Sequence, residues 1–177
     1  MIFVFSTLLL ILCLCNRKSK IVFVLGIIFL WILFGWSSNN ADSGIYLNRY
    51  NNYGGNIFSI TEPLFTSIMQ IFNSLHFEYQ QFLVVISICI LAIYGIVIYK
   101  LTANINFVLL LYFIFPFSME VVQLRFTMAT AVIVVGFYFL IKDDKKKGII
   151  KYICCVIIAT LLHYASIFFF IMILPKL

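Results

Sequence analysis

Two residues whose side chains suit chemistry interrupt the apolar stretches of this sequence: an arginine and a histidine. Arg125 lies in the segment SMEVVQLRFTMA, five residues after Glu120 and two after Gln123. A charge inside an apolar segment is costly, so an arginine found there usually faces a cavity or a partner. Its planar guanidinium matches phosphate oxygens through two parallel hydrogen bonds, which favours anion binding. The alternatives are a structural ion pair with Glu120, or a side chain that extends to the outer lipid head groups.

The histidine, His163, begins the polar segment HYAS inside the last apolar stretch. A neutral imidazole accepts a proton from a hydroxyl group near neutral pH, so His163 is a candidate general base. A structural histidine held by hydrogen bonds is the alternative. If His163 lies at the same depth and on the same face as Arg125, the two side chains serve one site.

The one long polar stretch, residues 38–80, adds further candidates. It is rich in Asn, Tyr, Ser and Gly. Tyrosine rings and amides suit sugars, whose hydroxyls need donors and acceptors and whose C–H faces stack on aromatic rings; an aromatic belt at a membrane interface is the alternative. Two of its acids, Asp42 and Glu62, would each orient a substrate hydroxyl or pair with Arg49. The candidates are Asp42, Tyr46, Arg49, Tyr50 and Glu62.

Several kinds of chemistry have no support in the sequence. It contains no glycine-rich phosphate loop, no serine-nucleophile motif and no H-E-x-x-H. The five cysteines lie in apolar runs without the spacing of a tetrahedral metal site, so they are expected to be small buried side chains. We therefore expect no metal and no cofactor. The net charge of +6 is spread between apolar runs rather than gathered on one solvated face, which argues against nucleic acid as a partner.

The elements that must hold these residues are membrane helices. The chain is 64% hydrophobic and only 10% charged, with a mean hydropathy of +1.14, against about 45–50% and about 25% in soluble domains. A spanning helix needs about 20 apolar residues, so 177 residues with one long loop allow about six or seven. We predict a single all-α polytopic membrane domain with an outward loop at residues 38–80. The predicted spans are 1–15, 21–37, 82–99, 106–117, 119–141, 149–162 and 164–175.

Two features refine this prediction. Thr61-Glu62-Pro63 is a typical helix start, and the apolar side chains from Leu64 to Leu75 fall on one face, which predicts an amphipathic helix at the membrane surface. Nine of the 12 basic residues fall on one side of the predicted spans. Because cytoplasmic loops carry the excess of Lys and Arg, the N-terminus and the 38–80 loop are expected on the outer side of the membrane.

Four short motifs occur in order along the chain: Asn40-Ala41-Asp42 with Tyr46 and Tyr50, Glu62-Pro63-Leu64-Phe65, Gln123-Leu124-Arg125 with Ala129, and His163-Tyr164-Ala165-Ser166. Their order and their common predicted face resemble the EpsG-like, Wzy-type polysaccharide polymerases of bacterial capsule, exopolysaccharide and O-antigen pathways. The resemblance covers roughly residues 38 to 170. Members of that family are usually longer, with further spans after the histidine motif, so the resemblance implies a truncated member.

The resemblance implies a membrane glycosyltransferase whose donor is an undecaprenyl-diphosphate-linked glycan rather than a nucleotide sugar. Arg125 would bind the diphosphate, His163 would act as a base or a second diphosphate contact, and Asp42 would join them as a catalytic acid of the outer loop. Glu62, Tyr46, Arg49, Gln123 and Tyr50 would contact the substrate. Membrane lipid and other polysaccharide-assembly proteins are the expected partners.

The alternative is a non-catalytic accessory subunit, or a lipid-linked oligosaccharide transporter, of the same pathway. A transporter would carry ionisable residues along several spans, whereas Arg125 and Glu120 are nearly alone within the predicted spans and lie toward one face.

Overall fold

The computed structural model describes residues 2–37, 40–52 and 62–176, and within these ranges every regular element is helical. The all-α prediction is therefore confirmed for this part of the chain. In chain order the elements are α1 (Ile2–Cys15), α2 (Lys20–Gly35), α3 (Ser43–Asn52), α4 (Pro63–Ser74), α5 (Tyr79–Leu101), α6 (Ile105–Ile114), α7 (Pro116–Val122), α8 (Leu124–Lys142), α9 (Lys145–Leu162) and the 3-10 helix η2 (Tyr164–Lys176).

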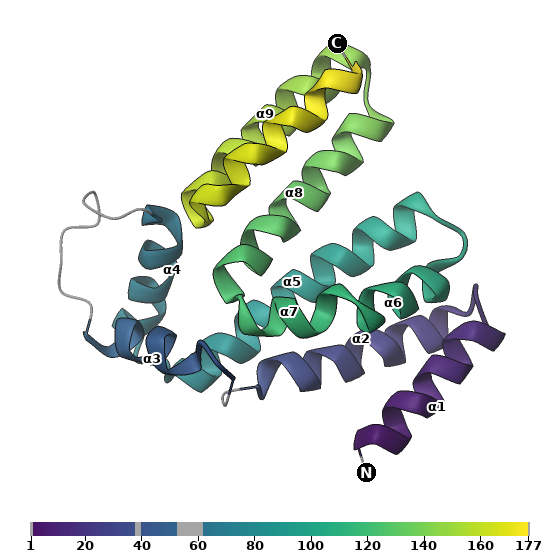
Figure 1. Cartoon of the computed structure of the whole chain (residues 1–177), viewed down its shortest axis with the longest axis horizontal. Helices are drawn as coiled ribbons and strands as arrows, with labels where there is room; N and C mark the ends of the chain where they lie inside the picture. Colours follow the sequence, from purple (N-terminus) through teal and green to yellow (C-terminus); the bar gives the residue numbers. More distant parts are fainter. Residues whose placement is uncertain (1, 38–39, 53–61, 177) are drawn as a thin grey trace.

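The helices form two groups that α5 joins. In Figure 1, α8, α9 and η2 lie side by side, while α1, α2, α5 and α6 form the second group and α3 and α4 cover one end. Helix α5 packs against both α2 and α8. The pairing of α2 with α5 is antiparallel, because the Gln80 side chain donates to the Gly35 carbonyl and the Trp31 indole donates to the Val84 carbonyl at 3.0 Å.

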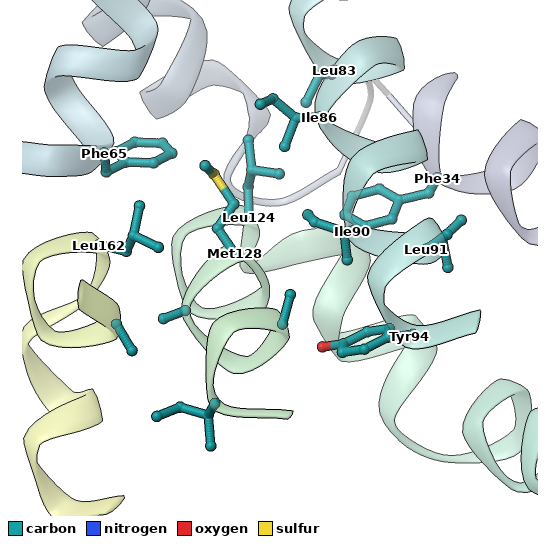
Figure 2. Packing of buried hydrophobic residues seen from close by; sticks show 14 of the residues in the cluster. Phe34, Phe65, Leu83, Ile86, Ile90, Leu91, Tyr94, Leu124, Met128 and Leu162 are labelled. Carbon is teal, nitrogen blue, oxygen red and sulfur yellow. The ribbon is translucent and has the colours of Figure 1, made fainter. Parts of the chain in front are cut away.

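Apolar side chains from α2, α4, α5, α8 and α9 meet in one core. Figure 2 shows Leu124 and Met128 of α8 between Phe65 of α4 and the α5 side chains Ile86 and Ile90. These are all buried. Burying one such side chain stabilises a fold by about 1.5–3 kcal/mol, so this layer fixes α8 between its neighbours.

The most extensive helix contact, between α8 and α9, depends on a glycine. A Cβ atom placed on Gly136 would lie 2.9 Å from Cδ2 of Tyr152 and 3.0 Å from Cβ of Cys155, so this position has no room for a side chain. Tyr152 is fully buried there, and its hydroxyl donates to the Phe169 carbonyl at 2.8 Å. This hydrogen bond links α9 to η2 and so helps to hold the segment after His163 against the α8–α9 pair.

The expected number of six or seven spans was too high. Among the described residues, α5 and α8 are long and apolar enough to cross a membrane, and the pair α6 and α7, bent by 58°, gives a third span if it is taken as one. The helix α2 is apolar but has only 16 residues, about 24 Å against a hydrocarbon thickness of about 30 Å. The helix α9 fails for another reason, since four lysines lie in its first seven residues.

Several predicted boundaries were also wrong. Pro116 was taken as the end of a span, but it begins α7, where a proline costs nothing because its missing N–H would have had no helical partner. The predicted span 119–141 is in fact divided at Gln123, whose φ of −97° and ψ of 64° are not helical. The helix predicted over 149–162 begins four residues earlier, at Lys145. The break at His163 is confirmed, because α9 ends at Leu162 and η2 follows.

The predicted amphipathic helix of the outer loop is present as α4. Its apolar face lies against the protein, with Phe65 and Met69 buried and α4 in contact with α3, α5 and α9. Packing thus accounts for much of the amphipathic pattern, although Ile71 and Leu75 are exposed. A position at the membrane surface stays a prediction. The capping hydroxyl predicted at Thr61 lies outside the described residues.

Glu120 does not form the ion pair with Arg125 that the sequence left open. Its carboxylate accepts hydrogen bonds from the hydroxyls of Tyr94, at 3.1 Å, and Tyr112, at 2.8 Å. Tyr94 also shares a hydrogen bond of 2.8 Å with Thr130. All of these side chains line an apolar cavity of about 430 Å³ between α5, α6, α7 and α8. Through these hydrogen bonds, Glu120 links the bent α6–α7 pair to α5.

Replacing Glu120 by alanine is expected to lower the free energy of unfolding by about 1–3 kcal/mol, because it leaves the half-buried Tyr112 hydroxyl without its acceptor. Glu120→Gln, which keeps one acceptor oxygen, should lose clearly less. Thermal unfolding in detergent, followed by the fluorescence of Trp31 and Trp36, measures both. An alanine variant as stable as the unmodified protein would show that this hydrogen-bond network does not hold the fold.

Candidate functional site

A buried carboxylate, that of Glu62, is the centre of the site. Its side chain is only 2% exposed, and three basic side chains converge on it. Nη1 of Arg125 lies 2.5 Å from Oε2, Nδ1 of His163 lies 2.6 Å from Oε1, and Nη1 of Arg49 lies 3.6 Å from Oε2. A buried charge needs such partners to offset the loss of hydration. We call Tyr46, Arg49, Glu62, Arg125 and His163 together the Glu62 cluster.

Further contacts fix the two guanidinium groups. Nε of Arg125 donates to the Tyr46 hydroxyl at 3.3 Å, and its Cζ lies 5.5 Å from the centre of the Tyr46 ring. Nη2 of Arg49 donates to Oγ1 of Thr66 at 3.2 Å, and that hydroxyl donates to the Glu62 carbonyl at 3.1 Å. Each arginine is therefore held at two points, which orients its remaining N–H groups.

Four separate parts of the chain bring these residues together. Tyr46 and Arg49 are three residues apart in α3 and so share one face of that helix. Glu62 directly precedes Pro63, the first residue of α4. Arg125 lies in the first turn of α8, and His163 lies in the turn between α9 and η2. In Figure 1 the start of α4 lies beside that turn, in agreement with the contact between α4 and α9.

The cluster carries more positive than negative charge and is partly open. Two guanidiniums surround one carboxylate, which leaves an excess of one positive charge even with a neutral imidazole. The side chains of Arg125, Arg49 and His163 are 32%, 22% and 20% exposed. Their exposed N–H groups can bind an anion such as a phosphate group.

The hydrogen bond to Glu62 also determines what the imidazole can do. A carboxylate paired with a guanidinium only accepts hydrogen bonds, so Nδ1 of His163 is the donor. In the neutral ring the lone pair then lies on Nε2. The carboxylate orients the ring and stabilises the positive charge that it gains on accepting a proton, as in a catalytic triad. The ring edge also contacts Phe126, at 5.8 Å between centroids, which limits its rotation.

Three predicted site residues lie outside this cluster. Among the described residues, the Asp42 carboxylate forms no ion pair with Arg49, Arg125 or His163; its backbone carbonyl accepts from the Ile45 and Tyr46 amides of α3. The Gln123 side chain is exposed, and its backbone precedes α8. Tyr50 is buried against Tyr79 and Phe82 and donates to the Phe77 carbonyl at 2.7 Å. Burial raises the pKa of the Tyr50 hydroxyl, so it stays protonated as that donor.

Two contributing residues, Thr66 and Phe126, were not identified from the sequence. Thr66 lies four residues after Glu62, on the same side of α4, so helical spacing could have indicated it. Phe126 had no such signal, because its contact with His163 depends on how α8 packs against α9. Within the described ranges no group of three His, Cys, Asp or Glu side chains is placed to bind a metal ion.

The lysines gather at the other end of the molecule. Lys20 begins α2, Lys142 ends α8, and Lys100 is the next-to-last residue of α5. Arg125, in contrast, lies where α8 begins. The 19 residues of α8 extend over about 28 Å, so the helix separates the lysine end from the Glu62 cluster by roughly the thickness of a bilayer core.

A family model described as the EpsG family matches residues 20–176, which is most of the chain. The chain belongs to the EpsG family. The match includes all of the Glu62 cluster, and it confirms the family resemblance inferred from the four motifs. Together with its apolar helices, membership identifies this EpsG-family chain as a membrane protein of polysaccharide biosynthesis. No curated protein and no solved structure matches the chain.

Proposed function

We propose that this EpsG-family protein is a polysaccharide polymerase that joins repeat units carried on undecaprenyl diphosphate. The observation that carries the proposal is the convergence of Arg49, Arg125 and His163 on the buried Glu62. It combines a cationic surface for a diphosphate leaving group with an oriented base for an acceptor hydroxyl, the two requirements of such a transfer.

The proposed reaction is a single displacement at the anomeric carbon of the donor glycan. The acceptor hydroxyl of a second lipid-linked unit forms the new glycosidic bond, and its proton passes to Nε2 of His163. The bond between the anomeric carbon and the diphosphate oxygen breaks, and undecaprenyl diphosphate leaves with the electron pair. Arg125 and Arg49 stabilise the charge that develops on the leaving group. Glu62 holds all three basic groups in place.

The other predicted residues have lesser parts in this proposal. Asp42 and Gln123 remain proposed contacts to the sugar units; the exposed Gln123 lies two residues before Arg125. Tyr50 supports α3, because its hydroxyl is already bound by the Phe77 carbonyl. Tyr46 combines a ring face under Arg125 with a hydroxyl that accepts from it, so it positions the guanidinium.

We place the site at the outer face of the bacterial inner membrane. The lysines at the opposite end support this orientation, because basic residues favour the cytoplasmic side. The lipid-linked glycan would then approach from the outer leaflet, and other polysaccharide-assembly proteins would supply it there.

The test is His163→Gln in the native strain, which keeps a polar side chain but removes the base. Formation of long polymer should fall about 100-fold while single repeat units accumulate on the lipid carrier, because general base catalysis contributes at least about that factor. A gel of the lipid-linked glycans separates the two species. The chain's other histidine, the exposed His76, gives the matched control His76→Gln, which should form normal polymer.

An unchanged chain-length distribution in His163→Gln, with the protein present in the membrane, would rule out His163 as the base. If Arg125→Ala also formed normal polymer, the catalytic proposal as a whole would fail. A non-catalytic accessory role would then be the better account.

A further inference from the structure

An apolar groove lies on the surface formed by α2 and α5, at the lysine end of the molecule. Its volume is about 570 Å³. Exposed apolar side chains of both helices line it, among them Val24, Ile28 and Ile96. Two cations, Lys20 at the start of α2 and Lys100 near the end of α5, lie at one end of this groove together with Tyr99.

A second, smaller apolar groove lies on the other side of α5. Its volume is about 200 Å³, and side chains of α5 and α8 line it, including Val135 and Phe139. Lys100 and Ile96 belong to both grooves. One cation therefore stands where two apolar grooves meet, on either side of the same helix.

The charges of Lys20 and Lys100 have no counter-ion within the described part of the chain. Neither Lys20 nor Lys100 forms an ion pair there, and no Asp or Glu lines either groove. Instead, each ammonium lies over an aromatic ring: Nζ of Lys20 is 5.4 Å from the ring centre of Tyr99, and Nζ of Lys100 is 5.2 Å from that of Tyr138. These contacts orient the lysines but leave their charge available.

We propose that the two grooves bind one anionic diacyl phospholipid, with its phosphate between Lys20 and Lys100 and one acyl chain in each groove. An ammonium is a compact point charge suited to phosphate, and the Tyr99 hydroxyl offers a further donor. Two apolar grooves that meet at a common cation match a lipid with two chains and one charged head. Basic pockets between membrane helices bind anionic head groups on the same physical grounds.

The groove between α2 and α5 also has room that a side chain could fill. A Cβ atom placed on Gly95, which lines this groove, would make only ordinary contacts, the nearest being 3.6 Å from Cδ1 of Ile27. The backbone therefore tolerates a Cβ atom at position 95, and a leucine there would compete with an acyl chain for the groove. This allows the apolar and the ionic parts of the proposal to be tested separately.

The experiment uses the full chain in nanodiscs of phosphatidylglycerol and phosphatidylcholine, about one to four, and native mass spectrometry of the lipid retained after release. The unmodified protein should keep one phosphatidylglycerol. Because each lysine near an anionic lipid is worth about fivefold in affinity, K20Q/K100Q should lower the preference for phosphatidylglycerol about 30-fold. Gly95→Leu should weaken retention of phosphatidylglycerol at least fivefold while both lysines remain.

The control is K146Q/K147Q, which removes the same charge at the same end of the molecule but outside both grooves. It should keep the lipid preference unchanged. Equal loss in K146Q/K147Q, or no loss in K20Q/K100Q, would overturn the proposal. Full retention in Gly95→Leu, displacement of the lipid by inorganic phosphate alone, or preferred retention of a polyprenyl phosphate would overturn it as well.

Discussion

Replacing Glu62 by glutamine is expected to stop polymer formation and to lower the free energy of unfolding by about 3–5 kcal/mol, the cost of removing one partner from a buried ion pair. The variant keeps the shape of the side chain. It loses the charge that offsets Arg49 and Arg125. The amide nitrogen of the glutamine is a donor, and it would face the donor group of either Arg125 or His163. His163 would lose the acceptor that orients its ring.

Two measurements test this expectation: the polymer formed in the native strain, and thermal unfolding of the purified variant. Glu78→Gln is the matched control, because Glu78 is exposed and a glutamine there can still cap α5. If Glu62→Gln unfolds too readily for the polymer assay, Glu62→Asp retains the charge at a greater distance and should show reduced activity in a folded protein. Normal polymer in both variants would rule out a central role for this carboxylate.

The second large effect is expected for Arg125→Lys. Lysine keeps the positive charge near Glu62, so the protein should remain folded. It cannot reproduce the guanidinium fork, in which Nε bonds to Tyr46 while Nη1 bonds to Glu62 and other N–H groups stay open to a ligand. The rate of polymer formation should fall about 1,000-fold, the upper end of the loss for an oriented donor that stabilises developing charge.

Membrane vesicles loaded with lipid-linked repeat units would give this rate directly. Arg17→Lys is the control for the chemical change itself, because Arg17 lies at the lysine end, where its Cζ is 5.6 Å from the Phe107 ring. It should polymerise at the normal rate. An unchanged rate in Arg125→Lys would mean that only a positive charge is needed at this position. It would contradict the proposal that the guanidinium binds the diphosphate through two hydrogen bonds.

The sequence indicated which residues form the site better than it indicated which of them contact one another. Arg125 and His163 stood out because polar groups are rare in apolar runs, and Glu62 because it lies at a helix start within the polar loop. Their meeting could not be predicted, since Glu62 is 63 residues from Arg125 and 101 from His163. Proximity along the chain misled in the case of Glu120: the non-helical Gln123 separates it from Arg125, and the carboxylate pairs instead with Tyr94 and Tyr112.

The fold was predictable to a similar degree. Composition alone required helices, and the helix-start pattern at Pro63 and the polar break at His163 located two boundaries well. Hydropathy could not distinguish a proline that ends a helix from one that begins the next, which is why Pro116 was misplaced. It also overestimated the number of spans, since an apolar run such as α2 is hydrophobic throughout but short.

The wide separation of Glu62 from its partners has a consequence during biosynthesis. Among the charged residues of the cluster, the ribosome delivers Arg49 and Glu62 first, Arg125 later and His163 last, so the carboxylate lacks its imidazole partner until α9 has been made. In the proposed mechanism, a nascent chain therefore holds no oriented base before its last helices have docked. Completion of the Glu62 cluster is then one of the last steps in folding, because it joins the segment before α4 to the turn that follows α9.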